Sequence, residues 1–353
     1  MKTVLVLCGG RSSEREVSCV SASAVLRNLP AGWKPVLAWI APDGGWHLQR
    51  DAGALARSPE PRAHRFDRNP ASLHPGTPSK LTAGGRKVVP DAVFPVLHGP
   101  FGEDGTLQGL LEMLGWAYVG AGVLGSSVGM DKEVSKRLSV HAGLPILPYA
   151  VLAAREDLTA ARRLRLPVFV KPARQGSSVG VYKVKKAGDL AAAVRKAFRF
   201  DTTVVVEQGI AAREIELSVL GMPGAARASV PGEIRPNAEF YSYEAKYLDP
   251  DGAALIVPAE LSKTQAAEAR ALALKAFEVL GGYGMARVDF LMDQSSGKLW
   301  FNEVNTLPGF TAVSMYPKLW AASGLPFPRL VKALLDLAVR RRRASAALRI
   351  TRD

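Results

Sequence analysis

One stretch near the end of the chain, residues 287–305, combines residue types that could do chemistry. Apolar residues alternate with others through 288–292 and again through 299–301, and Asp-Gln-Ser-Ser-Gly separates the two runs, which predicts a β-hairpin. Pairing centred on Ser296 places Asp289 opposite Glu303. The same register pairs Arg287 with Asn305. Side chains two residues apart on a strand share a face, so one polar patch is expected.

The pair Asp289 and Glu303 predicts a metal site. Two carboxylates directly opposite each other repel unless a positive charge lies between them. Carboxylate and amide oxygens, with no His or Cys nearby, suit magnesium, which commonly arrives with the phosphates of a nucleotide. We therefore predict Asp289, Glu303 and Asn305 as metal ligands. The alternative is a solvated hairpin face.

The first predicted strand ends at another acidic residue. Residues 3–8 predict a short buried strand, and two glycines end it before a helix. Ser13-Glu14-Arg15-Glu16 matches a capping box, in which Glu16 bonds the backbone of the helix start. Glu14 then lies beyond the carboxyl end of the strand, where open α/β sheets bind ligands, and can hold a substrate ammonium. The alternative is a favourable charge at a helix N-terminus.

A second strand, residues 91–97, ends at His98 before the loop His-Gly-Pro-Phe-Gly-Glu-Asp-Gly and a helix. Glycines in this loop let a ligand approach, so His98 is a candidate binding residue. A structural histidine is the equal alternative. Residues 40–90, rich in Pro, Gly, Arg and His, predict surface loops with one or two short strands.

Residues 120–125, Gly-Ala-Gly-Val-Leu-Gly, match the fingerprint G-x-G-x-x-G, which makes an oxidoreductase an alternative. That motif needs an acidic residue about twenty positions later, where this chain has His141-Ala-Gly-Leu-Pro. The sequence also lacks a GxxxxGK[ST] phosphate loop. The segment instead enters a helix with Lys132 in its first turn. Lys132 either binds phosphate or is a solvated helix lysine.

Residues 166–184 predict a strand, a glycine-rich loop and a second strand. Such a loop is a flap whose backbone N–H groups can bind phosphates, with Lys171 as a fixed charge at the strand end. A helix at 190–198 and a buried strand at 202–210 follow. The backbone at Gln208 to Ile210 can bind an adenine edge, while Glu207 holds the ribose.

The last third of the chain supplies a strand, a long loop and two helices. Residues 214–220 alternate apolar and acidic side chains as a strand does. Residues 236–258 predict a long loop of the kind that covers an active site. A helix at 263–280 precedes the hairpin. Residues 306–314 then form a turn into a helix N-terminus, a natural seat for a carboxylate.

A length of 353 residues predicts two or three domains, and 48% hydrophobic residues, an ordinary soluble globular composition, is ample for packed cores. No apolar run reaches the ~18 residues of a membrane span, and the chain enters a strand without a basic signal region. A cytoplasmic protein is expected. Cys8 and Cys19 fit a reducing compartment and lack metal-ligand spacing.

The formal net charge of +14 could indicate nucleic acid or attract small anions. Much of the excess lies in a basic tail formed by Arg340 to Arg343, Arg349 and Arg352. No other helix carries a basic stripe interleaved with aromatic residues. Nucleic-acid binding is therefore not expected.

Together these motifs resemble the D-alanine–D-alanine ligase family of the ATP-grasp superfamily. Six motifs in the family's order carry the resemblance, at residues 9–18, 98–105, 130–132, 171–180, 243–247 and 302–309. Each motif alone is modest, but six in order over nearly the whole chain are specific.

The resemblance implies an α/β protein with a three-lobed ATP-grasp fold. Residues 1–120 would form a Rossmann-like pre-ATP-grasp lobe, residues 121–211 a central lobe with the flap, and residues 212–353 a C-terminal lobe with the hairpin. ATP would lie between the last two lobes. In such enzymes ATP phosphorylates one D-alanine, and the amine of a second attacks the acyl phosphate, giving D-alanyl-D-alanine for peptidoglycan synthesis.

The resemblance also assigns roles by position. Catalytic residues would be Glu14, Ser177, Arg287, Tyr247 and His98. Substrate-binding residues would be Glu14, His98, Arg287, Gly309 and Ser314. Nucleotide-binding residues would be Lys132, Lys171, Ser178, Glu207, Gln208, Ile210, Glu214, Lys246 and Asn302. Asp289, Glu303 and Asn305 would hold two Mg²⁺ ions, for which Mn²⁺ can substitute. A homodimer, with no nucleic-acid or membrane partner, is also implied.

Two other functions stay open. The first is another ATP-grasp ligase; Tyr247 favours an amino-acid acceptor, since relatives that make D-alanine–D-lactate carry a different residue at this lid position. The second is a non-catalytic nucleotide- or nucleic-acid-binding protein. Gln208 departs from some relatives, which have a lysine there, and residues 40–90 match no motif.

Overall fold

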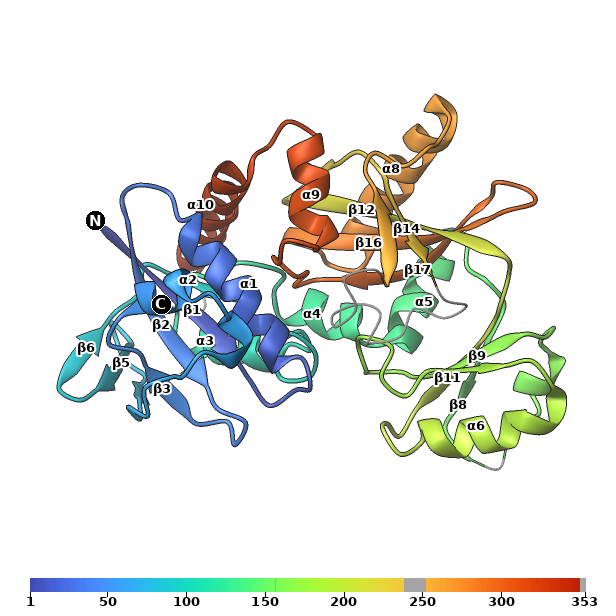
Figure 1. Ribbon diagram of the computed structural model, residues 1–353, viewed down its shortest axis with the longest axis horizontal. Helices are drawn as coiled ribbons and strands as arrows, with labels where there is room; N and C mark the ends of the chain where they lie inside the picture. The colour runs from blue at the N-terminus through green and yellow to red at the C-terminus, as the bar shows by residue number, and fades with distance from the viewer. Residues whose placement is uncertain (156, 238–251, 350–353) are drawn as a thin grey trace.

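The computed structural model describes residues 1–155, 157–237 and 252–349. Figure 1 shows three groups of strands and helices, with the N-terminal group on one side and two later groups on the other. Helices α4 (Val123–Met130) and α5 (Lys132–His141) lie between them. Within the described residues, no helix combines the length and apolar composition needed to cross a membrane.

The N-terminal lobe is built on a four-stranded sheet in the order β3-β2-β1-β7. Its strands are β1 (Lys2–Gly9), β2 (Trp33–Ile40), β3 (Trp46–Leu48) and β7 (Ala92–Pro95), and its main helices are α1 (Arg15–Arg27) and α3 (Thr106–Met113). Alternate residues of β1 belong to two cores. Val4 and Val6 share a core with α1, whereas Leu5 and Leu7 share one with α3. The sheet is therefore buried on both faces, as its continuous apolar run predicts.

The predicted capping box at the start of α1 is wrong. The helix begins at Arg15 with Glu14 as its N-cap residue, and no side chain caps it. Glu14 is buried, and its carboxylate accepts a hydrogen bond from Ser177 of the flap. This distant contact draws Glu14 towards the cavity instead of the helix backbone.

Residues 40–90 contain more regular structure than predicted. They form β3, helix α2 (Ala52–Arg57), a short 3-10 helix (Pro61–Ala63) and a second sheet of β4 (Ser72–His74), β5 (Lys80–Ala83) and β6 (Arg86–Val88). Leu81, Ala83 and Val88 are buried in the same core as Leu48. These strands are too short to show periodicity, so tertiary packing decides their structure.

The central lobe is an antiparallel sheet in the order β10-β9-β11-β8. Its strands are β8 (Tyr149–Leu152), β9 (Val168–Pro172), β10 (Tyr182–Val184) and β11 (Val204–Gln208), and it packs on α6 (Leu190–Ala197). The predicted strand, flap and strand are confirmed, because the loop at 173–181 joins β9 to β10. Lys171 and Glu207 come from neighbouring strands of this sheet.

The C-terminal lobe carries the predicted hairpin. Its sheet runs β15-β14-β12-β16-β17, with β12 (Ala212–Gly221), β14 (Gly232–Pro236), β15 (Ala253–Ile256), β16 (Gly284–Asp293) and β17 (Leu299–Asn305). Asp289 pairs with Glu303 and Arg287 with Asn305, as predicted. A shift after Asp289 then pairs Phe290 with Phe301 and leaves Asn302 as the extra residue of a bulge. Helix α8 (Lys263–Val279) packs on this sheet and starts with a capping box at Ser262.

The predicted basic tail is largely a packed helix, α10 (Phe327–Ala346), which follows α9 (Met315–Ala322). Leu330, Leu334 and Ala338 share a core with β1 of the N-terminal lobe. Arg341 donates to the carbonyls of Gly120 and Tyr118 at 2.7 and 2.9 Å, and its guanidinium lies 4.0 Å from the centre of the Tyr118 ring. At least one arginine of this segment therefore joins the first and last parts of the chain.

Candidate active site

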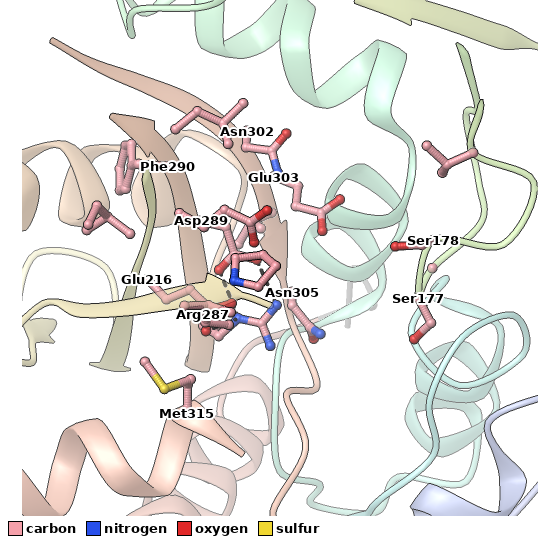
Figure 2. A pocket seen from close by; sticks show the side chains of 18 of the residues that line it. Ser177, Ser178, Glu216, Arg287, Asp289, Phe290, Asn302, Glu303, Asn305 and Met315 are labelled. Atoms are coloured by element: carbon pink, nitrogen blue, oxygen red, sulfur yellow. Dashed lines mark hydrogen bonds and ion pairs between the residues drawn. The ribbon is translucent and has the colours of Figure 1, made fainter. Parts of the chain in front are cut away.

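A cavity of about 920 Å³ opens where the three lobes meet. Residues predicted from the sequence line it from every lobe: Glu14, His98, Lys132, Lys171, Ser177, Ser178, Glu207, Gln208, Ile210, Glu214, Arg287, Asp289, Asn302, Glu303, Asn305, Gly309 and Ser314. Lys246 and Tyr247 lie outside the described residues. Figure 2 shows the hairpin residues facing Ser177 and Ser178 of the flap across this space.

The hairpin residues fit a hard divalent cation by their chemistry. Asp289 and Glu303 are cross-strand partners, and Asn305 adds an amide oxygen on the same face. In the part of the chain that the structure describes, no group of three or more His, Cys, Asp or Glu side chains is arranged around a metal position. Two carboxylates and an amide leave coordination positions for water or phosphate oxygens, as magnesium requires.

Positive side chains balance these carboxylates in the structure. Arg287 donates to both oxygens of Asp289, from Nε at 2.8 Å and from a terminal nitrogen at 2.7 Å. Lys132 Nζ lies 3.6 Å from a carboxylate oxygen of Glu303. Asn305 Oδ1 accepts from the backbone N–H of Leu307 at 3.0 Å. A bound cation would replace part of this positive charge.

Arg287 is also paired with Glu216, a residue that the sequence analysis did not select. Glu216 lies on β12 opposite Asp289, and one of its oxygens is 3.1 Å from Arg287 Nε. Burial alone would lower the pKa of Arg287, but Asp289 and Glu216 outweigh it and raise that pKa further. The acidic face of residues 214–220 was the available signal; the pairing with β16 was not visible in the sequence.

Two lysines share the carboxylate of Glu207. Lys171 Nζ donates to one oxygen at 2.9 Å, and Lys136 Nζ lies 3.2 Å from the other. Burial alone would raise the pKa of Glu207, but the two lysines lower it to about 2. Both oxygens are engaged, which argues against the predicted ribose contact of Glu207. Lys136, on α5, was not selected from the sequence.

The flap is held over the cavity at two points. Ser177 donates a hydrogen bond to a carboxylate oxygen of Glu14, which joins the central lobe to the N-terminal lobe. Lys132 Nζ donates to the carbonyl of Gln175 at 2.7 Å. Ser177 and Ser178 both have positive φ, 49° and 61°, a conformation that is uncommon for residues other than glycine. These two serines are therefore held in place by tertiary contacts.

His98 is buried beside a carboxylate that the sequence analysis did not select. Its Nδ1 lies 3.6 Å from Glu103 and 3.1 Å from the carbonyl oxygen of Leu307. Burial opposes protonation, but Glu103 and the nearby Glu14 outweigh it and raise the pKa of His98. The imidazole thus stays protonated to a higher pH than usual, next to the cavity.

The turn after the hairpin forms a small polar site. Ser314 is the N-cap residue of α9, and its Oγ accepts from the N–H of Thr311 at 2.9 Å. A Cβ atom added at Gly309 would lie 2.7 Å from the same Oγ, so glycine keeps this position open. The backbone of Gly309 and the hydroxyl of Ser314 can therefore both face a small anion.

Comparisons with known proteins cover almost all of the chain. The family models described as D-ala D-ala ligase N-terminus and C-terminus match residues 3–121 and 138–336. A D-alanine–D-alanine ligase A from Bradyrhizobium diazoefficiens is 47% identical, covering 98% of this chain and 97% of its own. A D-alanine–D-alanine ligase from Treponema denticola is 42% identical over 99% of each chain.

Solved structures agree with the sequence comparison. The D-alanine–D-alanine ligase from Coxiella burnetii superposes with a TM-score of 0.87 at 37% identity, covering 98% of this chain and 96% of its own. A D-Ala:D-Ser ligase from Enterococcus faecalis gives 0.85 at 32% identity, covering 96% and 99%. The fold is therefore the three-lobed α/β ATP-grasp fold, as predicted. The chain belongs to the D-alanine–D-alanine ligase family, whose members are ligases that use ATP and a divalent metal ion.

Proposed function

We propose that this protein joins two D-alanine molecules at the expense of ATP. One observation carries the proposal: Ser177 of the flap bonds Glu14 at the same cavity that holds Asp289, Glu303 and Asn305. One cavity therefore combines a site for the anionic phosphates of a nucleotide with a site for an ammonium group. This is the arrangement that an ATP-driven ligation of amino acids needs.

The chemistry follows in two steps. A carboxylate oxygen of the first D-alanine attacks the γ-phosphorus of ATP, ADP leaves, and an acyl phosphate forms. The amine of the second D-alanine then attacks the acyl carbon, loses a proton, and phosphate leaves. Glu14 holds the first ammonium, while Arg287 stabilises negative charge on the acyl phosphate and the tetrahedral intermediate, where preorganised donors contribute most.

Different charged residues of the cavity bind the nucleotide and the metal ions. Lys132 and Lys171 bind phosphate oxygens, as does Lys246 from outside the described residues. Asp289, Glu303 and Asn305 hold two Mg²⁺ ions, for which Mn²⁺ can substitute; bound there, the ions neutralise the charge of the phosphates. Glu214 lines the cavity beyond Ile210 and takes the ribose in place of Glu207.

The remaining predicted residues complete the substrate sites. Ser178 lies on the flap and Asn302 in the bulge of β17, both beside the phosphate position. Gln208 and Ile210 offer backbone groups to adenine. His98, beside Glu103, and Ser314 with the backbone of Gly309 bind the carboxylate of the second D-alanine. Tyr247 lies outside the described residues, and for it we keep the lid role that the resemblance assigns, together with Ser177 and Glu14.

The cellular setting follows from the reaction. D-alanyl-D-alanine is a building block of peptidoglycan precursors, so we place the enzyme in the cytoplasm, where ATP is available. We propose a homodimer, as for the resembling family. The lobe limits 1–120, 121–211 and 212–353 remain a proposal, because Val128 and Leu144 share a core with the C-terminal sheet and α10 packs on the N-terminal lobe.

An assay of phosphate release tests the proposed function. With ATP and Mg²⁺, D-alanine should give phosphate and D-alanyl-D-alanine in equal amounts. A panel of amino and hydroxy acids, including D-serine and D-lactate, identifies any other acceptor. ATP binding without turnover on the whole panel would instead support the non-catalytic alternative.

We expect the acceptor to be chosen as an amine, with D-lactate a poor substrate between mildly acidic and mildly alkaline pH. Tyr247 offers no cation to attract a negatively charged hydroxy acid. D-alanine must lose its ammonium proton before it attacks, so dipeptide formation should rise above neutral pH. The measurement follows both products across this range. Efficient use of D-lactate near pH 7 would contradict the lid argument.

We expect Glu216→Gln to lower kcat more than it changes KM for ATP. Glu216 holds Arg287 from the side opposite the hairpin, and an amide keeps the shape but loses the charge of that contact. Removing one charge of a buried ion pair leaves the other uncompensated, so a loss of roughly 10-fold or more in kcat is expected. Steady-state kinetics measure it. Glu260→Gln, which removes an exposed carboxylate, is the control and should behave as wild type.

A further inference from the structure

Lys136 is a buried lysine that does not line the cavity. Only 2% of its side chain is exposed, and its Nζ lies 3.2 Å from Glu207 and 3.5 Å from the carbonyl oxygen of Asn302. The ring of Tyr149 lies 5.9 Å from the same nitrogen. Lys171 and Glu207, in contrast, both line the cavity. Lys136 can therefore reach a bound nucleotide only through the residues that it contacts.

The three charged side chains come from three different elements and contact one another in a row. Lys136 comes from α5, Glu207 from β11 and Lys171 from β9. Each oxygen of the Glu207 carboxylate faces one lysine, so the cluster keeps one net positive charge. If Lys136 were neutral, Glu207 would cancel the charge of Lys171, and the cavity would lose a cation at this wall.

A purely structural lysine is a poor explanation of this geometry. Burying an ammonium costs several kcal/mol even when it is paired, and a well-packed apolar side chain is often as stable. Lys136 also contacts Glu207 on the oxygen opposite Lys171, and both of those residues line the cavity. The charge, more than the packing, is what this position supplies.

We propose that Lys136 is a positioning residue for the phosphates of ATP. It binds one oxygen of Glu207, so that Glu207 orients Lys171 without neutralising it. The inference rests on the proposed function in that it takes Lys171 as a ligand of nucleotide phosphates. It adds a residue that acts through Glu207 and Lys171.

Binding of charged and uncharged ligands to variants of Lys136 tests this role. In Lys136→Met, calorimetry should show that ATP and ADP bind at least roughly 10-fold more weakly than they bind wild type. This loss corresponds to about 1.4 kcal/mol for one lost ionic contact. Adenosine, which lacks phosphates, should bind as it does to wild type. KM for ATP should rise, while KM for D-alanine stays within about 2-fold of wild type.

A double variant separates charge from packing. Lys136→Met with Glu207→Gln restores one net positive charge, so it should bind ATP more tightly than Lys136→Met alone. Arg137→Met, on the exposed side of the same helix, is the matched control and should match wild type. Lys136→Gln, which keeps a hydrogen-bond donor but no charge, should show the same phosphate-specific loss with less effect on the unfolding temperature.

Three results would overturn the inference. Equal weakening of adenosine and ATP would show that the pocket has collapsed. Weaker ATP binding in the double variant than in Lys136→Met alone would show that removing the charge of Glu207 does not compensate for the loss of Lys136. Failure of both Lys136→Met and Lys136→Gln to fold would make the residue structural. Wild-type enzyme that binds ATP but makes no dipeptide would contradict the proposed function and leave this inference intact.

Discussion

Arg287→Ala should lose far more in turnover than in ATP affinity. The guanidinium faces the cavity from β16 and is held by Asp289 and Glu216, so its position is fixed before substrate binds. Negative charge develops in front of it only as the acyl phosphate and the tetrahedral intermediate form. Loss of such a preorganised donor costs roughly 3 kcal/mol, or more than 100-fold in kcat.

Kinetics and binding on the same variant test this expectation. kcat should fall by the full amount, while the dissociation constant of ATP should change by less than about 5-fold. Arg287→Lys keeps the charge but cannot bond both oxygens of Asp289, so it should recover only part of the rate. The unfolding temperature of each variant shows whether losing the contact of Arg287 with the buried Glu216 destabilises the sheet. Equal losses in kcat and ATP affinity would make Arg287 a simple phosphate ligand.

The hairpin shows what a single sequence can predict. Alternation of apolar residues and a pairing centred on Ser296 predicted Asp289 opposite Glu303, which the structure confirms, whereas on the turn side of the bulge the strands pair one residue out of that register, Phe290 with Phe301. The bulge was not predicted, although the buried residues Leu299, Phe301 and Val304 break the period of two at Asn302, the extra residue. Only one or two short strands were predicted in residues 40–90, where the structure has four, since three or four residues carry no clear period.

Individual side chains were harder to select than motifs. Glu216, Lys136 and Glu103 look like ordinary strand, helix and loop residues until their partners are known. For Glu216 and Lys136 the partner lies on another element, Arg287 on β16 and Glu207 on β11, whereas Glu103 faces His98 within one loop. Pairing between distant segments gives these residues their roles. Several of the residues that were selected, such as Glu14, His98 and Ser177, stood beyond strand ends or beside glycines, where the chain itself indicates a site.

Positive side chains of the cavity already contact the carboxylates that are predicted to bind metal. Asp289 is bound by Arg287, and Lys132 lies close to Glu303, so both carboxylates already face cations. A divalent ion must compete with these contacts. Glu216 can keep Arg287 in place when Asp289 turns to a cation, because it lies on β12 and contacts Nε of Arg287 as well. Metal binding should therefore depend on Glu303 at least as strongly as on Asp289.

Glu303→Gln should abolish ATP turnover and leave the fold intact. The substitution keeps the shape of the side chain but removes half of the carboxylate charge of the predicted metal set. Metal ions contribute several kcal/mol to stabilising charge on a transferring phosphoryl group, so a loss of roughly 1,000-fold in kcat is expected. Titration with Mn²⁺, followed by its paramagnetic signal, should show weaker binding in the variant. Circular dichroism should match wild type.

The matched control lies on the same hairpin. Asp293→Asn makes the same chemical change at the turn, where Asp293 bonds Ser295 and Ser296 and does not line the cavity. It should lower the unfolding temperature slightly and leave kcat and Mn²⁺ affinity unchanged. If Asp293→Asn lost as much activity as Glu303→Gln, damage to the hairpin would explain both. If Glu303→Gln kept near-normal activity, the metal assignment would fail, because a cation site between two opposed strands cannot lose one of its two charges without weakening.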